Sequence, residues 1–98
     1  MLTWAEPTDD GGTDITNYIV EKRESGNTSW QVVNSSVKRT TIKVSHLTKY
    51  MEYTFRVCAE NKLGVSKSVE STPMIAEHPF GKYNALNILV TFLFMLVL

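Results

Sequence analysis

The chain is short and electrically balanced. It has 98 residues, and ten lysine and arginine residues are matched by ten aspartate and glutamate residues, so the formal net charge is zero. This length allows a single domain, and the balanced charge argues against nucleic acid or an anionic membrane surface as a partner. The single cysteine, Cys58, excludes an internal disulfide. Because residues 1–7 also lack the features of a secretory leader, we expect a cytoplasmic, reducing location.

The first two predicted elements are strands on either side of a turn-rich segment. Residues 2–4 alternate between apolar and polar, as in a short strand, before Pro7 ends it. Residues 8–12 are rich in aspartate and glycine, which favour turns. Residues 15–23 alternate again, which predicts a second strand with one buried face. The residues that we place on the buried side of these strands are Trp4, Tyr18 and Val20.

Two shorter strands are predicted after a Ser-Gly-Asn turn at residues 25–27. The first covers residues 30–33 and ends at the polar run 34–36, which we interpret as a loop. The second covers residues 40–44, and a crossing between sheets follows it. The apolar residues assigned to this part of the core are Ile42, Val44 and Leu47. Trp30 is either buried as well or keeps a partly open face.

The clearest strand pattern lies between residues 53 and 60, where apolar and polar side chains alternate strictly. The turn at Asn61–Gly64 ends it, and a weakly patterned last strand is expected within residues 66–74, interrupted at Pro73. Short strands separated by turns every eight to twelve residues or so predict an all-β antiparallel sandwich. The inward set is Tyr53, Phe55, Val57 and Ala59, and the outward, solvated set is Thr54, Arg56, Cys58 and Glu60.

The chain contains several longer motifs, namely L-T-W-x-x-P at 2–7, D-D-G-G at 9–12, I-T-N-Y-I-V-E-K-R at 15–23, F-R-V-C-A-E-N-K-L-G-V-S at 55–66 and P-M-I-A-E-H-P-F at 73–80. Together they resemble the fibronectin type III domains of titin-like sarcomeric proteins. In this resemblance Tyr53 takes the tyrosine-corner position. The residues that carry the structural signature are Trp4, Pro7, Tyr18, Val20, Trp30, Ile42, Val44, Leu47, Tyr53, Phe55, Val57, Ala59, Asn61 and Gly64.

The resemblance implies a function in muscle. Such domains stand in tandem and form an elastic rod along the thick filament, so we expect a non-enzymatic, cofactor-free, protein-binding module of the sarcomeric A-band. The implied partners are myosin and the neighbouring domains of the parent chain. The outward charges of the strands, among them Glu21, Arg23 and Arg56, form either a solvated surface or a filament-facing patch. An integrin-binding role is disfavoured because the chain contains no Arg-Gly-Asp tripeptide.

The chain departs from the family at its N-terminal end. It starts almost on the strand that holds Trp4, so we assign residues 1–79 to an incomplete fibronectin type III domain that lacks strand A. The sheet that contains this strand would then keep two strands, which are marginal in water and leave an unprotected edge. We therefore expect lower stability than that of an intact domain, and a clear rise in Tm when about twenty native upstream residues are added.

A second departure begins after a junction at residues 80–84. Residues 85–98 carry no charge and only two polar side chains, Asn87 and Thr91. One interpretation is a tail anchor, which would make the chain a membrane-tethered adhesion or receptor fragment. Fourteen to sixteen residues as a helix would span about 21–24 Å, however, against a hydrocarbon core of roughly 30 Å. In water the segment is expected to fold against the sandwich or to aggregate.

Two other origins of the tail are compatible with the sequence. A glycosylphosphatidylinositol signal requires a secretory leader, which residues 1–7 do not resemble. Translated intron sequence is the third interpretation, because Gly81-Lys82-Tyr83 can be encoded by GGT-AAG-TAT, which contains the splice-donor string GTAAGT. Sequencing the locus across Gly81 separates these origins.

No constellation of residues supports catalysis or metal binding. His46 and His78 are far apart and lack acidic or cysteine neighbours at ligand spacing. The aspartates at 9, 10 and 14 are interpreted as turn residues, because the spacing of a calcium loop is missing. Cys58 has no histidine placed to activate it, so we expect a partly exposed, unreactive thiol.

Overall fold

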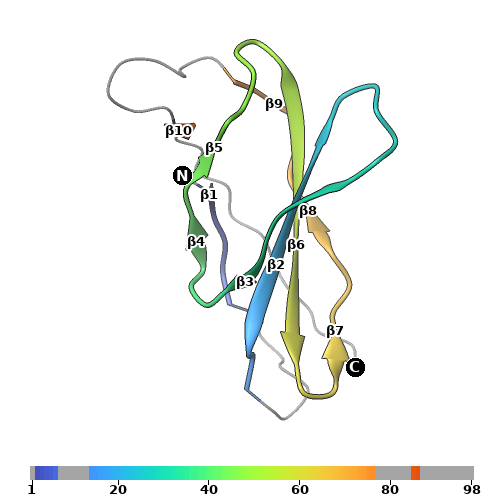
Figure 1. Ribbon diagram of the computed structural model, residues 1–98. Helices are drawn as coiled ribbons and strands as arrows, with labels where there is room; N and C mark the ends of the chain where they lie inside the picture. The colour runs from blue at the N-terminus through green and yellow to red at the C-terminus, as the bar shows by residue number, and fades with distance from the viewer. Residues whose placement is uncertain (1, 7–13, 77–84, 87–98) are drawn as a thin grey trace.

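A computed structural model describes residues 2–6, 14–76 and 85–86, and every regular element in these ranges is a strand. The prediction of an all-β antiparallel fold is confirmed. The two longest strands, β2 and β6, run side by side through the middle of the molecule (Figure 1). The strands are β1 Leu2–Thr3, β2 Asn17–Glu24, β3 Gln31–Val37, β4 Thr41–Ile42, β5 Val44–Ser45, β6 Glu52–Asn61, β7 Gly64–Val65, β8 Val69–Glu70, β9 Met74–Ile75 and β10 Ala85–Leu86.

The larger sheet is organised around β6. Its order is β3-β2-β6-β7, and β8 and β9 also pair with β6, so three short strands follow one edge of a long one (Figure 1). Strands β2 and β6 are antiparallel, with an unbroken register from Asn17 opposite Glu60 to Glu24 opposite Tyr53. Because side chains alternate between faces, this register brings Glu21 beside Arg56 on the outer face and Val20 beside Val57 on the inner face.

The second layer is built from four strands of two residues each. Strand β1 pairs with β4, and β5 pairs with β10, in two separate antiparallel ladders. The ladder of β1 continues by one further bond, in which the Trp4 backbone N–H donates to the Thr40 carbonyl at 2.9 Å. In the described residues, β1 has β4 as its only strand partner.

The core lies between the two layers and is centred on β6. Phe55, Val57 and Ala59 are fully buried, and Trp4 of the second layer meets Tyr18 of the large sheet edge-to-face, with ring centroids 5.4 Å apart. Each large apolar side chain buried in this way stabilises the fold by about 1.5–3 kcal/mol. The buried hydrophobic residues are Leu2, Trp4, Tyr18, Val20, Val37, Val44, Tyr53, Phe55, Val57, Ala59 and Ala76, and Ile15, Val33, Ile42, Leu47, Val69 and Met74 pack against them.

Two hydrogen-bonded connections fix the ends of β6. Before the strand, the Tyr53 hydroxyl accepts a hydrogen bond from the Thr48 backbone N–H at 2.8 Å, which is the geometry of a tyrosine corner. After the strand, the buried Asn61 side chain accepts hydrogen bonds from the N–H groups of Leu63 at 2.9 Å and Gly64 at 3.2 Å. Gly64 has a φ of 149°, which a glycine adopts without a steric penalty.

Two sequence-based predictions were wrong in detail. Residues 34–36 are not a loop but part of β3, because the strand continues along β2 as far as Val37, which is buried. Exposed polar side chains are compatible with a strand at the edge of a sheet. Thr54, placed in water by the alternation, is only 7% exposed. Its side chain is short, and its register partner on β2 is the much longer Arg23.

Candidate protein-binding surface

The outer face of the large sheet carries a cluster of aromatic and charged side chains. The cluster consists of Glu21 and Arg23 on β2, Arg56 on β6, and Trp30, which directly precedes β3. Residues 21 and 23 share a face because they are two apart on one strand, and the register brings Arg56 opposite Glu21. We call these four residues the tryptophan–arginine cluster.

Glu21 and Arg56 form a two-bonded ion pair across the strands. Arg56 Nε donates to Glu21 Oε1 at 2.9 Å, and an Arg56 terminal nitrogen donates to Glu21 Oε2 at 3.2 Å. The side chains are 26% and 16% exposed, so the pair is shielded from much of the solvent. The hydrogen bond to Glu21 raises the pKa of Arg56 above its ordinary value, and the Glu21 charge adds to this effect. This pair holds the Arg56 guanidinium in one orientation.

Trp30 is stacked against both arginines. The guanidinium carbon of Arg56 lies 4.2 Å from the indole ring centroid, and that of Arg23 lies 4.8 Å from it. Both distances are within the range of cation–π attraction. Trp30 is half-buried. In the described part of the chain, Arg23 forms no ion pair with a carboxylate.

One exposed apolar side chain and one further carboxylate lie beside the cluster. Val32, opposite Glu21 on β3, is 59% exposed. On the other side, Glu70 of β8 stands opposite Arg56. The surface is therefore mixed in charge and partly apolar, with one aromatic ring held against two arginines. Aromatic residues and arginine are enriched in protein–protein interfaces, so this arrangement suits a protein surface better than a small molecule.

Cys58 lies on the same face and has the partial exposure expected from the sequence. Burial raises the pKa of its thiol above the ordinary value, and the Glu21 charge raises it further, while Arg56 opposes the shift. A raised pKa lowers the thiolate fraction at neutral pH, so the site disfavours nucleophilic chemistry. Within the described ranges, no three histidine, cysteine or acidic side chains are grouped to hold a metal ion.

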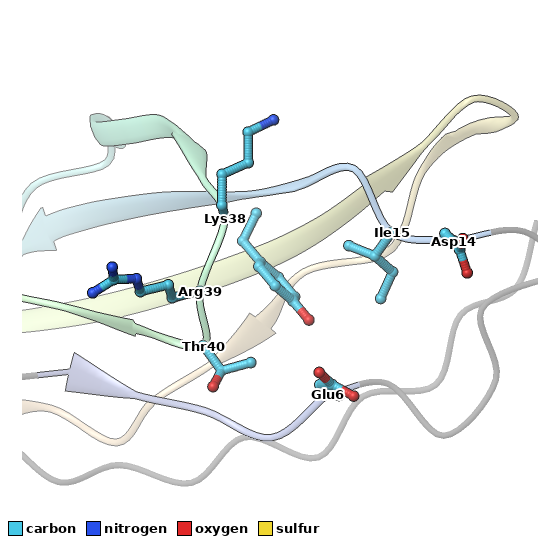
Figure 2. A pocket seen from close by; sticks show the side chains of 7 residues that line it. Glu6, Asp14, Ile15, Lys38, Arg39 and Thr40 are labelled. Atoms are coloured by element: carbon cyan, nitrogen blue, oxygen red, sulfur yellow. The ribbon is translucent and has the colours of Figure 1, made fainter.

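A cavity of about 510 Å³ lies at one end of the sandwich. Figure 2 shows Glu6 and Thr40 on one side of it and Ile15 on the other, with Lys38 pointing away. The Lys38 ammonium donates to the Thr16 carbonyl at 3.0 Å. Burial raises the pKa of Tyr18, which also lines the cavity, and the Glu6 charge adds to the shift. The lining mixes both signs of charge and contains no convergent set of ligand-binding groups, so we do not assign a ligand to it.

The structural-signature residues occupy different environments. Asn61 and most of the aromatic and aliphatic members are buried, whereas Trp30, Ile42, Leu47 and Gly64 are half-buried. Pro7 lies outside the described residues, as do Asp9, Asp10 and His78. His46 is exposed and follows β5 with a φ of 60°. Sequence reasoning named the members of the tryptophan–arginine cluster but missed their contacts, because these depend on the β2–β6 register.

The architecture has a family match. The model of the fibronectin type III domain matches residues 1–76. The chain belongs to the fibronectin type III family. This fibronectin type III domain is 38% identical over 85 residues to titin of Drosophila melanogaster and 38% identical over 71 residues to cardiac-type myosin-binding protein C of Gallus gallus. The matches cover 84% and 72% of the chain, but only 0% and 6% of those much longer relatives.

A solved structure agrees with the sequence comparisons. The crystal structure of domains A168–A170 from titin has a TM-score of 0.72 and 44% identity, and the match covers 78% of this fibronectin type III domain and 26% of the titin chain. At this identity the likeness covers both fold and sequence, so the prediction of a titin-like sarcomeric fibronectin type III domain is confirmed.

Proposed function

We propose that this domain is a non-enzymatic, protein-binding module of a tandem rod in the sarcomere, and that the tryptophan–arginine cluster is its contact surface. The observation that carries the proposal is Trp30, whose ring is held against the guanidinium groups of two arginines on the outer face of the large sheet. A ring already fixed in place loses little conformational freedom when a partner covers it. The family and the named relatives support the setting in muscle.

The proposal also names a binding partner and a location in the sarcomere. The relatives include myosin-binding protein C, whose name states that it binds myosin, and M-protein of striated muscle. We infer that this domain contacts myosin along the thick filament in the A-band, in addition to neighbouring domains of its parent chain. Arg23 would meet a carboxylate of the partner, since no described carboxylate pairs with it, while Val32 and Trp30 would supply apolar contact.

Co-sedimentation with purified myosin filaments tests this function. We expect the full chain to sediment with the filaments, and we expect Trp30→Ala to weaken binding about tenfold or more, as for an interface hot spot. Leu63→Ala is the matched control, because Leu63 is an apolar side chain that is 61% exposed in the turn before β7, away from the cluster. Equal binding by all three proteins would disprove the role of the cluster, and no binding by the unaltered chain would disprove myosin as the partner.

The membrane-tethered alternative depends on residues 85–98. The structure describes Ala85–Leu86 of this segment as strand β10, and residues 87–98 lie outside the described part. In the parts of the chain that are described, no helix has the length and apolar character needed to cross a bilayer. After expression in cells, release of the full chain from membranes by carbonate would argue against an anchor, and retention would favour one.

A further inference from the structure

One strand of the second layer, β5, is paired with a segment that is distant in the sequence. Strand β5 follows β4 with one residue between them, and it pairs with β10 rather than with β1. Ala85 stands opposite Ser45 and Leu86 opposite Val44, in the same antiparallel sense in which β1 meets β4. Two short segments from opposite ends of the chain therefore share one partner, the stretch that runs from Thr41 to Ser45.

The surroundings of β5 leave room for a partner strand. A cavity of about 330 Å³ lies beside it, lined by the apolar side chains of Val32, Val33, Ile42 and Val44 and by five polar or charged ones. An unpaired strand edge leaves backbone N–H and C=O groups as a template for another strand. The two-residue ladder of β1 and β4 ends before it reaches Val44, so it cannot satisfy this edge.

We propose that β5 is a strand-acceptor edge and that its occupant is the chain's own apolar C-terminal segment, which enters the fold through Ala85–Leu86. This goes beyond the proposed function, because the site is in the other layer from the tryptophan–arginine cluster and needs no partner protein. The segment suits the edge chemically: residues 85–98 contain no charge and no proline, and they include several residues of high β-propensity.

Connectivity favours pairing within one chain over pairing between two copies. The backbone of Ala76 is bonded on both sides to the crossing before β6, since Tyr50 N–H donates to its carbonyl at 2.6 Å and its own N–H donates to Met51 O at 3.0 Å. Eight residues, 77–84, join Ala76 to Ala85. A connection this short gives a local concentration on the order of millimolar, which exceeds that of a second copy in a micromolar solution.

Amide hydrogen exchange on the full chain tests the proposal. Leu86→Pro removes a backbone N–H and prevents regular pairing at that position. Neighbouring residues of a strand direct their N–H groups to opposite sides, so only one of Val44 and Ser45 can donate to β10. We expect exchange at that residue to become about tenfold faster, while Val57 in the β2–β6 ladder keeps its rate and shows that the sandwich is folded. Leu96→Pro is the matched control, because it places proline in the same apolar segment but away from β10, and it should leave the donating residue of β5 protected.

The possible results of this experiment distinguish pairing within one chain from pairing between two copies. Unchanged exchange at Val44 and Ser45 in Leu86→Pro would overturn the proposal. Protection that appears only at high protein concentration, together with dimers in sedimentation velocity, would overturn the assignment to the chain's own segment and favour a second copy. Protection retained in Leu86→Val, which keeps the backbone N–H and a strand-favouring side chain, would support pairing through the backbone.

Discussion

The two layers of the sandwich are built in different ways. In the large sheet, β2 and β6 are paired over eight consecutive positions, and β6 also carries three short strands on its other side. In the second layer each ladder contains two pairs. A long ladder satisfies its own backbone and positions both faces, whereas two-stranded ladders are marginal in water without packing from outside.

The comparison shows where stability and recognition reside. The large sheet supplies the inner face of the core through Phe55 and Val57, and the same register builds the tryptophan–arginine cluster on its outer face. The second layer contributes the opposite side of the core, mainly through Leu2, Trp4 and Val44. Its strands come from segments at both ends of the chain. We therefore expect substitutions in the large sheet to affect folding more strongly than equivalent changes in the second layer.

The largest loss of stability is expected from Phe55→Ala. A small loss would contradict the expected difference between the two layers. Phe55 is fully buried at the centre of β6, so its truncation should lower the free energy of unfolding by about 3–5 kcal/mol. Ile42→Ala in β4 removes a half-buried side chain and should cost about 1–2 kcal/mol. Urea unfolding followed by tryptophan fluorescence measures both. Equal costs would contradict the larger contribution expected from the large sheet.

A smaller effect is expected at the connection between the layers. Tyr53→Phe removes the hydroxyl that accepts from the Thr48 N–H, and should cost about 1–2 kcal/mol because that donor is partly buried. Tyr50→Phe is the control, since the Tyr50 side chain is 69% exposed, and it should change stability by less than about 0.5 kcal/mol. Thermal unfolding of the two variants side by side gives the difference, and matching Tm values would contradict a role for the corner.

The smallest effect concerns Cys58 on the outer face of the large sheet. Its pKa is raised, so at any given pH its thiolate fraction is lower than that of an exposed thiol, and alkylation by iodoacetamide should be slow. The folded state favours the neutral form of the Cys58 thiol. The stability that this preference provides is present below the ordinary pKa of the thiol and is lost as the pH rises through its raised pKa. The loss should therefore begin only above about pH 9, the ordinary value of the thiol.

A substitution in the cluster sharpens this test. Glu21→Gln removes a charge that raises the pKa of Cys58 and leaves Arg56, which lowers it, so alkylation at pH 8 should become severalfold faster. Glu24→Gln lies on the same strand without contributing to that shift and should leave the rate unchanged. Identical rates in both variants would mean that burial alone governs the thiol.

Much of the fold could be predicted because its main strands carry local patterns. The alternation of Tyr53, Phe55, Val57 and Ala59 predicted an inner face, and all four residues are buried. The fold class and its sarcomeric family followed from that pattern and from the motifs around it. The prediction was wrong at residues 34–36, where polar side chains indicated a loop but backbone pairing with β2 continues the strand.

The candidate surface could be predicted only in part. The outward placement of Glu21, Arg23 and Arg56 follows from a period of two along each strand. The stacking of Trp30 on two arginines does not, because Trp30 lies outside the strands and Arg56 comes from a distant segment. Burial of Thr54 was missed as well, because a period of two predicts the face on which a side chain lies and not its exposed fraction.

By itself, the sequence determined which residues face inward and outward along β2 and β6, because that alternation is a property of the extended backbone and needs no partner. Tertiary structure decided the register between strands, and with it the Glu21–Arg56 pair, the position of Trp30 and the pairing of β10 with β5. Register depends on backbone hydrogen bonds between segments far apart in the chain, which no local pattern contains.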